Sequence, residues 1–241
     1  MDVIGDLMAR DRRSDRLALR VDGPGRTYTY HDLITTSYKA GNVLRYLGVR
    51  KGGHVAIEPT LLPEPILTFL GAAQLGAITA FDPQFEARAT VVDVERESEF
   101  EDLPPGQKLA VFGGPPSNST TTHWEQEVWS ENPAVHPEIV SPDDAALVAD
   151  DREYTHADLL TAAKRVVDDY GLDEDDTVAI RASLSHPGTV VAGVLAPLLV
   201  GGEILVPDGD DPVDAALIVR EHGTETNAVT PDEILDERRF T

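Results

Sequence analysis

The chain has 241 residues, of which 41% are hydrophobic, and 43 acidic against 20 basic residues give it a formal net charge of −23. This length can bury a large core in one domain or two, and the hydrophobic content excludes a disordered acidic tail. The acidity argues against nucleic-acid binding, because no basic stripe is present to neutralise phosphates. The lack of cysteine excludes disulfides, thiolate zinc sites and a cysteine nucleophile.

The first half of the chain alternates short strands and helices. It begins with a short amphipathic helix over 3–10 and a hairpin, whose strands at 17–21 and 27–28 flank the turn signal 22–25. We then expect a helix after Thr29, a strand over 54–58, a helix over 64–75, a strand over 77–81, a helix over 88–98 and a strand over 108–112.

The second half follows a stretch, 115–142, that is rich in Pro, Ser, Thr and Asn and is typical of a linker. Its two tryptophans, Trp124 and Trp129, indicate that it packs on the surface. After it we expect a helix following Thr155, a strand over 177–180, an apolar helix over 190–200, a helix over 211–222, a strand over 227–230 and a short acidic helix from Pro231.

Two stretches of the chain repeat each other. Residues 26–35 (RTYTYHDLIT) align with residues 152–161 (REYTHADLLT), and shorter matches follow in the same order. In each copy a threonine precedes an aspartate by three residues, the spacing of a helix N-terminal capping box. Gly48 and Gly171 then end the two helices.

The alternation of strands and helices predicts an α/β fold. Because the pattern occurs twice, we expect two pseudo-symmetric, mostly parallel sheets flanked by helices. The predicted division of the chain is a first α/β subdomain over 1–114, a linker over 115–142 and a second α/β subdomain over 143–241.

A small polar group follows the predicted strand 177–180 and is the candidate ligand site. Ser183, Ser185 and His186 lie there, where α/β folds place ligands. A turn histidine before Pro187 explains the same residues without a ligand. No catalytic group is expected, because the three are too close in sequence to act as a nucleophile and its base without a third orienting group.

Other polar features are interpreted as structural. Residues 113–122 superficially resemble a phosphate loop but contain no lysine, and two prolines remove N–H donors, so a surface loop is expected. His31 and His156, in first helical turns, are expected to face solvent. The acidic clusters at 173–176 and 208–211 are interpreted as solvated turns, and no spacing predicts a metal site.

The order of these pieces resembles the AMP-forming acyl-CoA synthetase and adenylating-ligase family. The resemblance runs from Tyr28-Thr-Tyr-His-Asp-Leu through Gly71-Ala-Ala-Gln-Leu-Gly-Ala to Pro197-Leu-Leu-Val-Gly-Gly and Ala228-Val-Thr-Pro231. It implies the family's large N-terminal domain, which has two α/β subdomains related by a pseudo-twofold axis. In the family, the position of His186 borders the acyl pocket.

The chain departs from the family where ATP would bind. The family carries a Ser/Thr/Gly-rich phosphate loop with a lysine just before the second capped helix. Here residues 147–154 (LVADDREY) contain no glycine, serine or lysine and carry three acids that would repel phosphate. The family's adenine motif, ribose-binding aspartate and catalytic lysine are also not found in this sequence.

We therefore expect a non-catalytic, degenerate and truncated relative of the family, a pseudoenzyme that binds a small acyl or nucleotide ligand or scaffolds a partner. The alternative is one subunit of a split ligase that another chain completes. No cofactor is expected in the first case, and ATP with Mg²⁺, or CoA, only in the second. Self-association is a further expectation, because missing structure would expose apolar surface.

A cytoplasmic location is expected, since the N-terminus Met1-Asp-Val-Ile-Gly-Asp carries no apolar signal segment and no apolar run is long enough to span a membrane.

The acidity also predicts a dependence on salt. A net charge of −23 repels itself in dilute buffer, whereas molar salt shortens the Debye length to about 3 Å, so we expect a halophilic protein. Dialysis into low salt should reduce the far-UV circular dichroism signal. A spectrum unchanged by salt removal would contradict the expectation.

Overall fold

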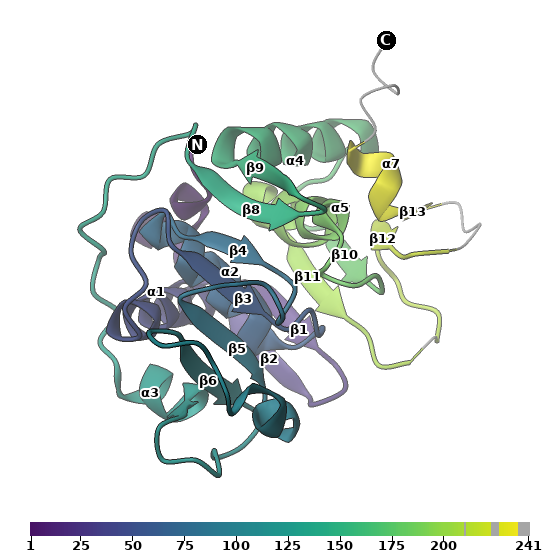
Figure 1. Ribbon diagram of the computed structural model, residues 1–241. Helices are drawn as coiled ribbons and strands as arrows, with labels where there is room; N and C mark the ends of the chain where they lie inside the picture. Colours follow the sequence, from purple (N-terminus) through teal and green to yellow (C-terminus); the bar gives the residue numbers. More distant parts are fainter. Residues whose placement is uncertain (210, 223–226, 236–241) are drawn as a thin grey trace.

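The computed structural model describes residues 1–209, 211–222 and 227–235, and it contains two sheets flanked by helices (Figure 1). The strands are β1 (Leu17–Val21), β2 (Arg26–Thr29), β3 (His54–Ile57), β4 (Ile78–Ala80), β5 (Ala89–Asp93), β6 (Lys108–Phe112), β7 (Thr122–His123), β8 (Ala145–Ala149), β9 (Arg152–Thr155), β10 (Thr177–Ile180), β11 (Glu203–Val206), β12 (Leu217–Val219) and β13 (Ala228–Val229).

The α-helices are α1 (Tyr30–Tyr46), α2 (Pro63–Leu75), α3 (Trp124–Ser130), α4 (His156–Tyr170), α5 (Pro187–Thr189), α6 (Ala196–Val200) and α7 (Pro231–Leu235). Short 3₁₀ helices are η1 (Ile4–Met8), η2 (Arg10–Arg12) and η3 (Val94–Phe100), and η4 (Val190–Leu195) is a π-helix. Within the described residues, no helix has both the length and the hydrophobicity needed to cross a membrane.

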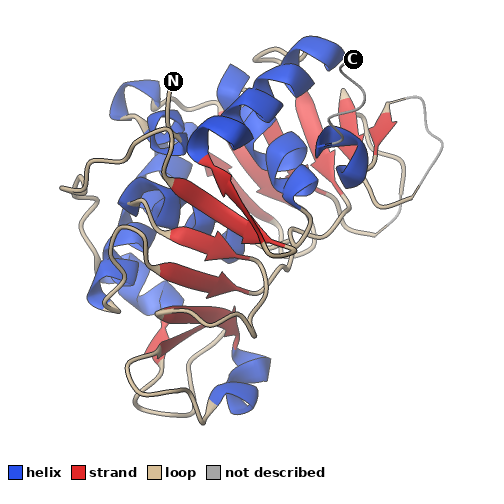
Figure 2. Cartoon of the chain, turned by 45° about the horizontal axis from the view of Figure 1, so that its top comes forward, coloured by secondary structure: helices blue, strands red, loops and turns tan. Residues whose placement is uncertain are grey.

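The strands form a seven-stranded sheet in the order β7-β6-β5-β3-β4-β8-β9 and a six-stranded sheet in the order β13-β12-β10-β11-β1-β2. Neighbouring described strands pair in parallel except in the two hairpins, β1–β2 and β8–β9. Figure 2 shows the strands of each sheet side by side with helices packed against them. The predicted fold class, two mostly parallel sheets flanked by helices, is confirmed.

Each hairpin belongs to the sheet of the opposite half of the chain. The β1–β2 hairpin lies beside β11 in the six-stranded sheet, whereas the helix that follows it, α1, packs on α2 of the first half. The β8–β9 hairpin lies beside β4 in the seven-stranded sheet, and its helix, α4, packs on η4 and α6. The division into 1–114, 115–142 and 143–241 stays a prediction. Strands from the first and the last of these segments pair with each other, β1 with β11 and β4 with β8.

Both predicted capping boxes are present. The Thr29 hydroxyl accepts from the Asp32 N–H at 3.1 Å, and the Asp32 carboxylate accepts from the Thr29 N–H at 3.2 Å. Thr155 and Asp158 make the same two bonds, each at 3.0 Å. The hydrogen bond with the Thr29 side chain is the main cause that lowers the pKa of Asp32. These bonds fix where the chain leaves each hairpin and enters a helix.

Two predicted helices are wrong. Residues 88–98 contain β5 followed by the 3₁₀ helix η3, and the stretch 211–222 contains irregular chain and β12. Residues 89–92 are fully buried, and β5 lies between β3 and β6. A strand buried on both faces lacks the alternation that marks a half-exposed strand, so its apolar run does not differ from that of a buried helix.

The predicted linker is partly structured. It contains β7 and α3, and Trp124 of α3 is buried, where its indole N–H donates to the Thr68 hydroxyl at 2.9 Å. Trp129 is 86% exposed, so only one of the two tryptophans anchors the segment.

The predicted apolar helix over 190–200 is confirmed as a core helix, although it contains the π-helical segment η4. Gly193 lies against β10, where an added Cβ would sit 2.7 Å from the side chain of Ile180. A residue without a side chain is therefore required at that contact.

His156 does not face solvent as predicted. It is fully buried at the start of α4, and its Nδ1 accepts a hydrogen bond from the Ile4 N–H at 3.2 Å. Burial is the main cause that lowers the pKa of His156 from 6.5 to about 4. The neutral imidazole thus ties the N-terminal segment to α4.

Acid is expected to weaken the fold through His156. The depression from 6.5 to about 4 corresponds to about 3 kcal/mol of stability, which is present in full above pH 6.5 and is lost as the pH falls toward 4. Asparagine offers an acceptor that does not titrate, so His156→Asn should show a shallower loss in urea unfolding between these pH values. His31→Asn, at a half-exposed histidine, serves as the control. A His156→Asn variant with the wild-type slope would contradict this role.

Candidate functional site

A cleft lies at the carboxyl ends of β4 and β8, in the seven-stranded sheet. It has a volume of about 320 Å³, and its lining is Ala80, Phe81, Asp82, Phe85, Val148, Ala149, Asp150, Asp151 and Ser185. The carboxyl ends of parallel strands are where open α/β sheets bind ligands. We call this feature the strand-end cleft, and it is the candidate site.

The strand-end cleft combines apolar walls with an acidic rim. Phe81 is buried and Phe85 half-buried, whereas the carboxylates Asp82, Asp150 and Asp151 are exposed. Among the described residues that line the cleft, none is basic. The cleft therefore suits an apolar group and disfavours an anion.

The turn between β8 and β9 sets the acidic side of this cleft. Ala149 pairs with Arg152 across the hairpin, which leaves a connection of two residues, Asp150 and Asp151. Both have positive φ, 49° and 59°, the geometry of a type I′ hairpin turn. A two-residue turn offers no run of backbone N–H groups that could surround a phosphate.

The sequence-predicted site residues are only partly brought together. Ser183 and Ser185 hydroxyls lie 2.9 Å apart, and Ser185 lines the strand-end cleft. His186 instead occupies the N-cap position of α5 without a side-chain capping bond, and its Nε2 lies 3.9 Å from a carboxylate oxygen of Glu221. A ligand-binding role for Ser183, Ser185 and His186 stays a prediction.

The other lining residues were not among the predicted site residues. Phe81 and Asp82 directly follow β4, and Asp150 directly follows β8. The rule that ligands bind at strand ends could have identified them, but only once β4 and β8 were known to be neighbours in one sheet.

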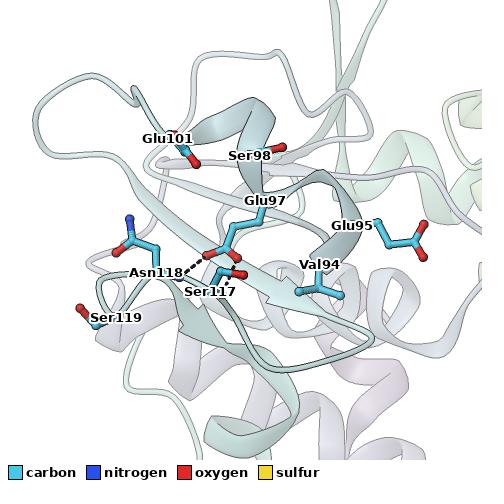
Figure 3. Close-up of a pocket in the computed structure, with 8 residues that line it drawn as sticks. All are labelled: Val94, Glu95, Glu97, Ser98, Glu101, Ser117, Asn118 and Ser119. Carbon is cyan, nitrogen blue, oxygen red and sulfur yellow. Dashed lines mark hydrogen bonds between the residues drawn. The ribbon is translucent and has the colours of Figure 1, made fainter.

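The loop 113–122 binds a carboxylate of its own chain (Figure 3). The N–H groups of Ser117 and Asn118 donate to the Glu97 carboxylate at 2.6 and 3.0 Å. These bonds, with that from Ser117 the largest cause, lower the pKa of Glu97. Glu97, Ser117 and Asn118 line a surface pocket, and Glu95 and Glu101 line it as well. The loop's donors thus hold it against η3, as a surface loop would be held.

Metal binding has no support in the part of the chain that the structure describes, where no group of three or more His, Asp or Glu side chains is placed to hold an ion. The cluster at 173–176 forms a turn of its own, with the Asp173 N–H donating to Asp176 at 2.8 Å and the Asp175 N–H donating to Asp173 at 2.8 Å.

The family model described as "AMP-binding enzyme" matches residues 8–149, more than half of the chain. The chain belongs to this family. The acetyl-coenzyme A synthetase of Gemmatimonas aurantiaca is 42% identical over 69 residues, which are 27% of this chain and 11% of that protein. The acetyl-coenzyme A synthetase of Rubrobacter xylanophilus is 40% identical over 76 residues, 30% of this chain and 12% of that protein.

Solved structures of the same fold include the anthranilate CoA ligase AuaEII in complex with anthranoyl-AMP, with a TM-score of 0.76, 20% identity, and coverage of 86% of this chain and 45% of that chain. Apo MatB from Rhodopseudomonas palustris gives a TM-score of 0.75 and 16% identity, covering 90% of this chain and 49% of that one. The N-terminal domain of FACL13 from Mycobacterium tuberculosis gives a TM-score of 0.69 and 17% identity, covering 87% of this chain and 58% of that one.

The chain spans about half the length of these solved structures, and the part of it that matches the curated synthetases covers about a tenth of their length. The family resemblance seen in the sequence is thereby confirmed. The adaptation to high salt stays a prediction.

The type I′ turn can be tested by giving it the residues that such turns prefer. Replacing Asp150 by Asn and Asp151 by Gly should raise the free energy of unfolding by about 1 kcal/mol, because this pair takes positive φ most readily. The matched control is Asp168→Asn with Asp169→Gly on the exposed side of α4. It removes the same two charges but should destabilise by about 1 kcal/mol, since it places glycine in a helix. Urea unfolding measures both. Destabilisation by the turn pair would contradict the geometry.

Proposed function

We propose that this protein is a non-catalytic member of the AMP-binding enzyme family, which binds a small uncharged acyl group in the strand-end cleft and does not activate it with ATP. The observation that carries the proposal is the acidic two-residue turn at Asp150 and Asp151. The family resemblance places a phosphate loop in that position. The match to the family model ends at Ala149, immediately before this turn.

Electrostatics argue against a nucleotide in the cleft. Adenylation requires donors and positive charge that stabilise the phosphoryl oxygens as charge develops on them. The cleft instead presents Asp82, Asp150 and Asp151, in a protein whose net charge is already −23. Arg152, the nearest cation in the sequence, lies after the turn with its guanidinium 4.8 Å from the centre of the Tyr154 ring. Of the two ligand types expected from the sequence, an acyl group is therefore a better candidate than a nucleotide.

The walls support an acyl group. Ala80, Phe81, Phe85, Val148 and Ala149 supply apolar surface, and a volume of about 320 Å³ lies at the lower end of small-molecule pockets. Ser185 adds one hydroxyl, which can donate to a carbonyl oxygen. These features fit the acyl end of a thioester, with any phosphates of its carrier held outside the cleft.

The second candidate is one subunit of a split AMP-forming ligase. What favours it is the family, because the chain belongs to the AMP-binding enzyme family and shares its fold with the anthranilate CoA ligase AuaEII. ATP with Mg²⁺, and CoA, would then bind only in the complex. The partner would have to supply the phosphate donors, since the β8–β9 turn does not.

The proposal is tested by thermal unfolding in 2–3 M KCl with four ligands: an uncharged short-chain acyl-N-acetylcysteamine thioester, the corresponding acyl-CoA, AMP and ATP with Mg²⁺. A ligand present at 100 times its Kd should add about 2.7 kcal/mol. In a chain of this size, that amount raises Tm by about 5 °C or more. The expected result is a shift with the two acyl compounds and none with AMP or ATP.

Phe85→Ala should reduce the acyl shift, because it removes an apolar wall, whereas Tyr46→Ala, an exposed aromatic outside the cleft, should leave it unchanged. A shift with ATP and Mg²⁺ would contradict the proposal and favour the split ligase. If neither acyl compound raises Tm, acyl binding would be rejected, and the remaining role would be a scaffold for a partner protein or a second copy.

A further inference from the structure

Residues 131–141 form a strap that connects α3 toward β8 without helix or strand and runs along the outside of α1 (Figure 1). Its backbone oxygens accept hydrogen bonds from side chains of neighbouring elements. Arg10 donates to Pro133, Asn42 of α1 donates to Asn132 at 2.7 Å, and Lys51 donates to Ile139 at 2.9 Å. All three bonds are solvent-exposed, so each contributes little.

His136 is the only side chain of the strap that is buried, with 7% of its surface exposed. Its ring stacks on Tyr38 of α1, with the ring centroids 5.7 Å apart. Neither ring nitrogen has a hydrogen-bond partner, although both are inaccessible to solvent. Such an arrangement is tolerable for a neutral imidazole and costly for a charged one, which carries two N–H donors.

The histidine sits in a notch that exists because two facing residues lack side chains. A Cβ on Gly41 of α1 would lie 2.4 Å from Nε2 of His136, and a Cβ on Gly71 of α2 would lie 2.6 Å from the backbone nitrogen of Gly41. Gly71 allows α1 and α2 to approach closely, and Gly41 leaves room for one flat ring. The fit therefore depends on the shape of the notch as well as on the histidine.

The charges around the ring come from three sides. Glu138 of the strap favours protonation and Arg45 of α1 opposes it, while burial is the largest cause and lowers the pKa of His136 to about 4. Arg10 of η2 lies over the Tyr38 ring at 5.4 Å. On α2 the only charged residue is Glu64 in its first turn, two turns before Gly71.

We propose that His136 is an acid-sensitive latch, which holds the strap on α1 when neutral and releases it when protonated, while the two sheets remain folded. Protonation would place a charge and two unpaired donors in the notch, and the ring can gain water only by leaving it. A pKa moved from 6.5 to about 4 weakens the seating of the ring about 20-fold at pH 5 relative to pH 7.

Hydrogen exchange followed by mass spectrometry tests the latch on the full chain, with rates corrected for the intrinsic effect of pH. The measured quantity is the ratio of strap opening at pH 5 to that at pH 7, from peptides within 131–141. Peptides from β3 and β10 report on the sheets. In the wild type the strap ratio should be about 20, from the shift given above, and the sheet peptides should exchange far more slowly than the strap at both pH values.

Variants separate the latch from other acid effects. His136→Phe and His136→Asn should bring the ratio to about 1 whatever their opening at pH 7, because neither side chain titrates. Both retain His156, whose backbone N–H donates to the Asp144 carbonyl just beyond the strap, so a ratio caused by His156 would persist in them. His31→Ala, at a half-exposed histidine of α1, should behave as the wild type.

Gly41→Ala tests the notch without altering the histidine. It should open the strap at pH 7, because the new Cβ occupies the position of the ring. A wild-type ratio near 1, a large ratio that persists in either His136 variant, or a Gly41→Ala strap as protected as the wild type would each overturn the proposal.

Discussion

Each sheet of this protein is completed by a hairpin from the other half of the chain, and most of the remaining architecture depends on this exchange. The β1–β2 hairpin joins β11 and the β8–β9 hairpin joins β4, so neither sheet forms fully from one half. Side-chain contacts next to the β1–β2 hairpin also connect it to both halves of the chain. The Tyr30 hydroxyl donates to the Gly202 carbonyl at 2.8 Å, and Arg26 of β2 forms an ion pair with the buried Glu64 of α2. Burial raises the pKa of Glu64, and Arg26 opposes that effect.

The hairpin exchange constrains the strands β8 and β9 more than the connection between them. The seven-stranded sheet needs the strands β8 and β9 for pairing, but it places no demand on the length or chemistry of the connection between them. In this chain the connection is the two-residue acidic turn Asp150–Asp151. The likeness to solved structures at 14–21% identity shows the shared fold, and the turn supplies two of the carboxylates that line the cleft.

Local signals in the sequence were sufficient to predict much of the fold. The capping boxes at Thr29 and Thr155 and the glycine at 171 mark helix ends through interactions within a few residues, and they are present in the structure. β5 and β12 were missed because strands buried on both faces carry no alternation. The hairpin exchange could not be read from local pattern, since its pairs, such as Leu19 with Ile204, join residues far apart in sequence.

The candidate site was less predictable for a related reason. Ser185 was found because it follows a strand, whereas Phe81, Asp82 and the Asp150–Asp151 turn become one cleft only through the pairing of β4 with β8. The buried histidines were missed because their surroundings come from distant elements. His156 contacts the N-terminal segment, and His136 fills a notch made by two helices.

Under the proposed function, this chain by itself does not activate a carboxylic acid with ATP. Adenylation releases pyrophosphate reversibly, so any chain that performs it transfers labelled pyrophosphate into ATP. The most direct measurement is this exchange with purified protein, ATP, Mg²⁺ and a panel of short- and medium-chain carboxylic acids in molar salt. A full-length ligase that tolerates the same buffer serves as the positive control. The account predicts exchange at the level of the protein-free background for every acid, whereas exchange above background with any of them would contradict it.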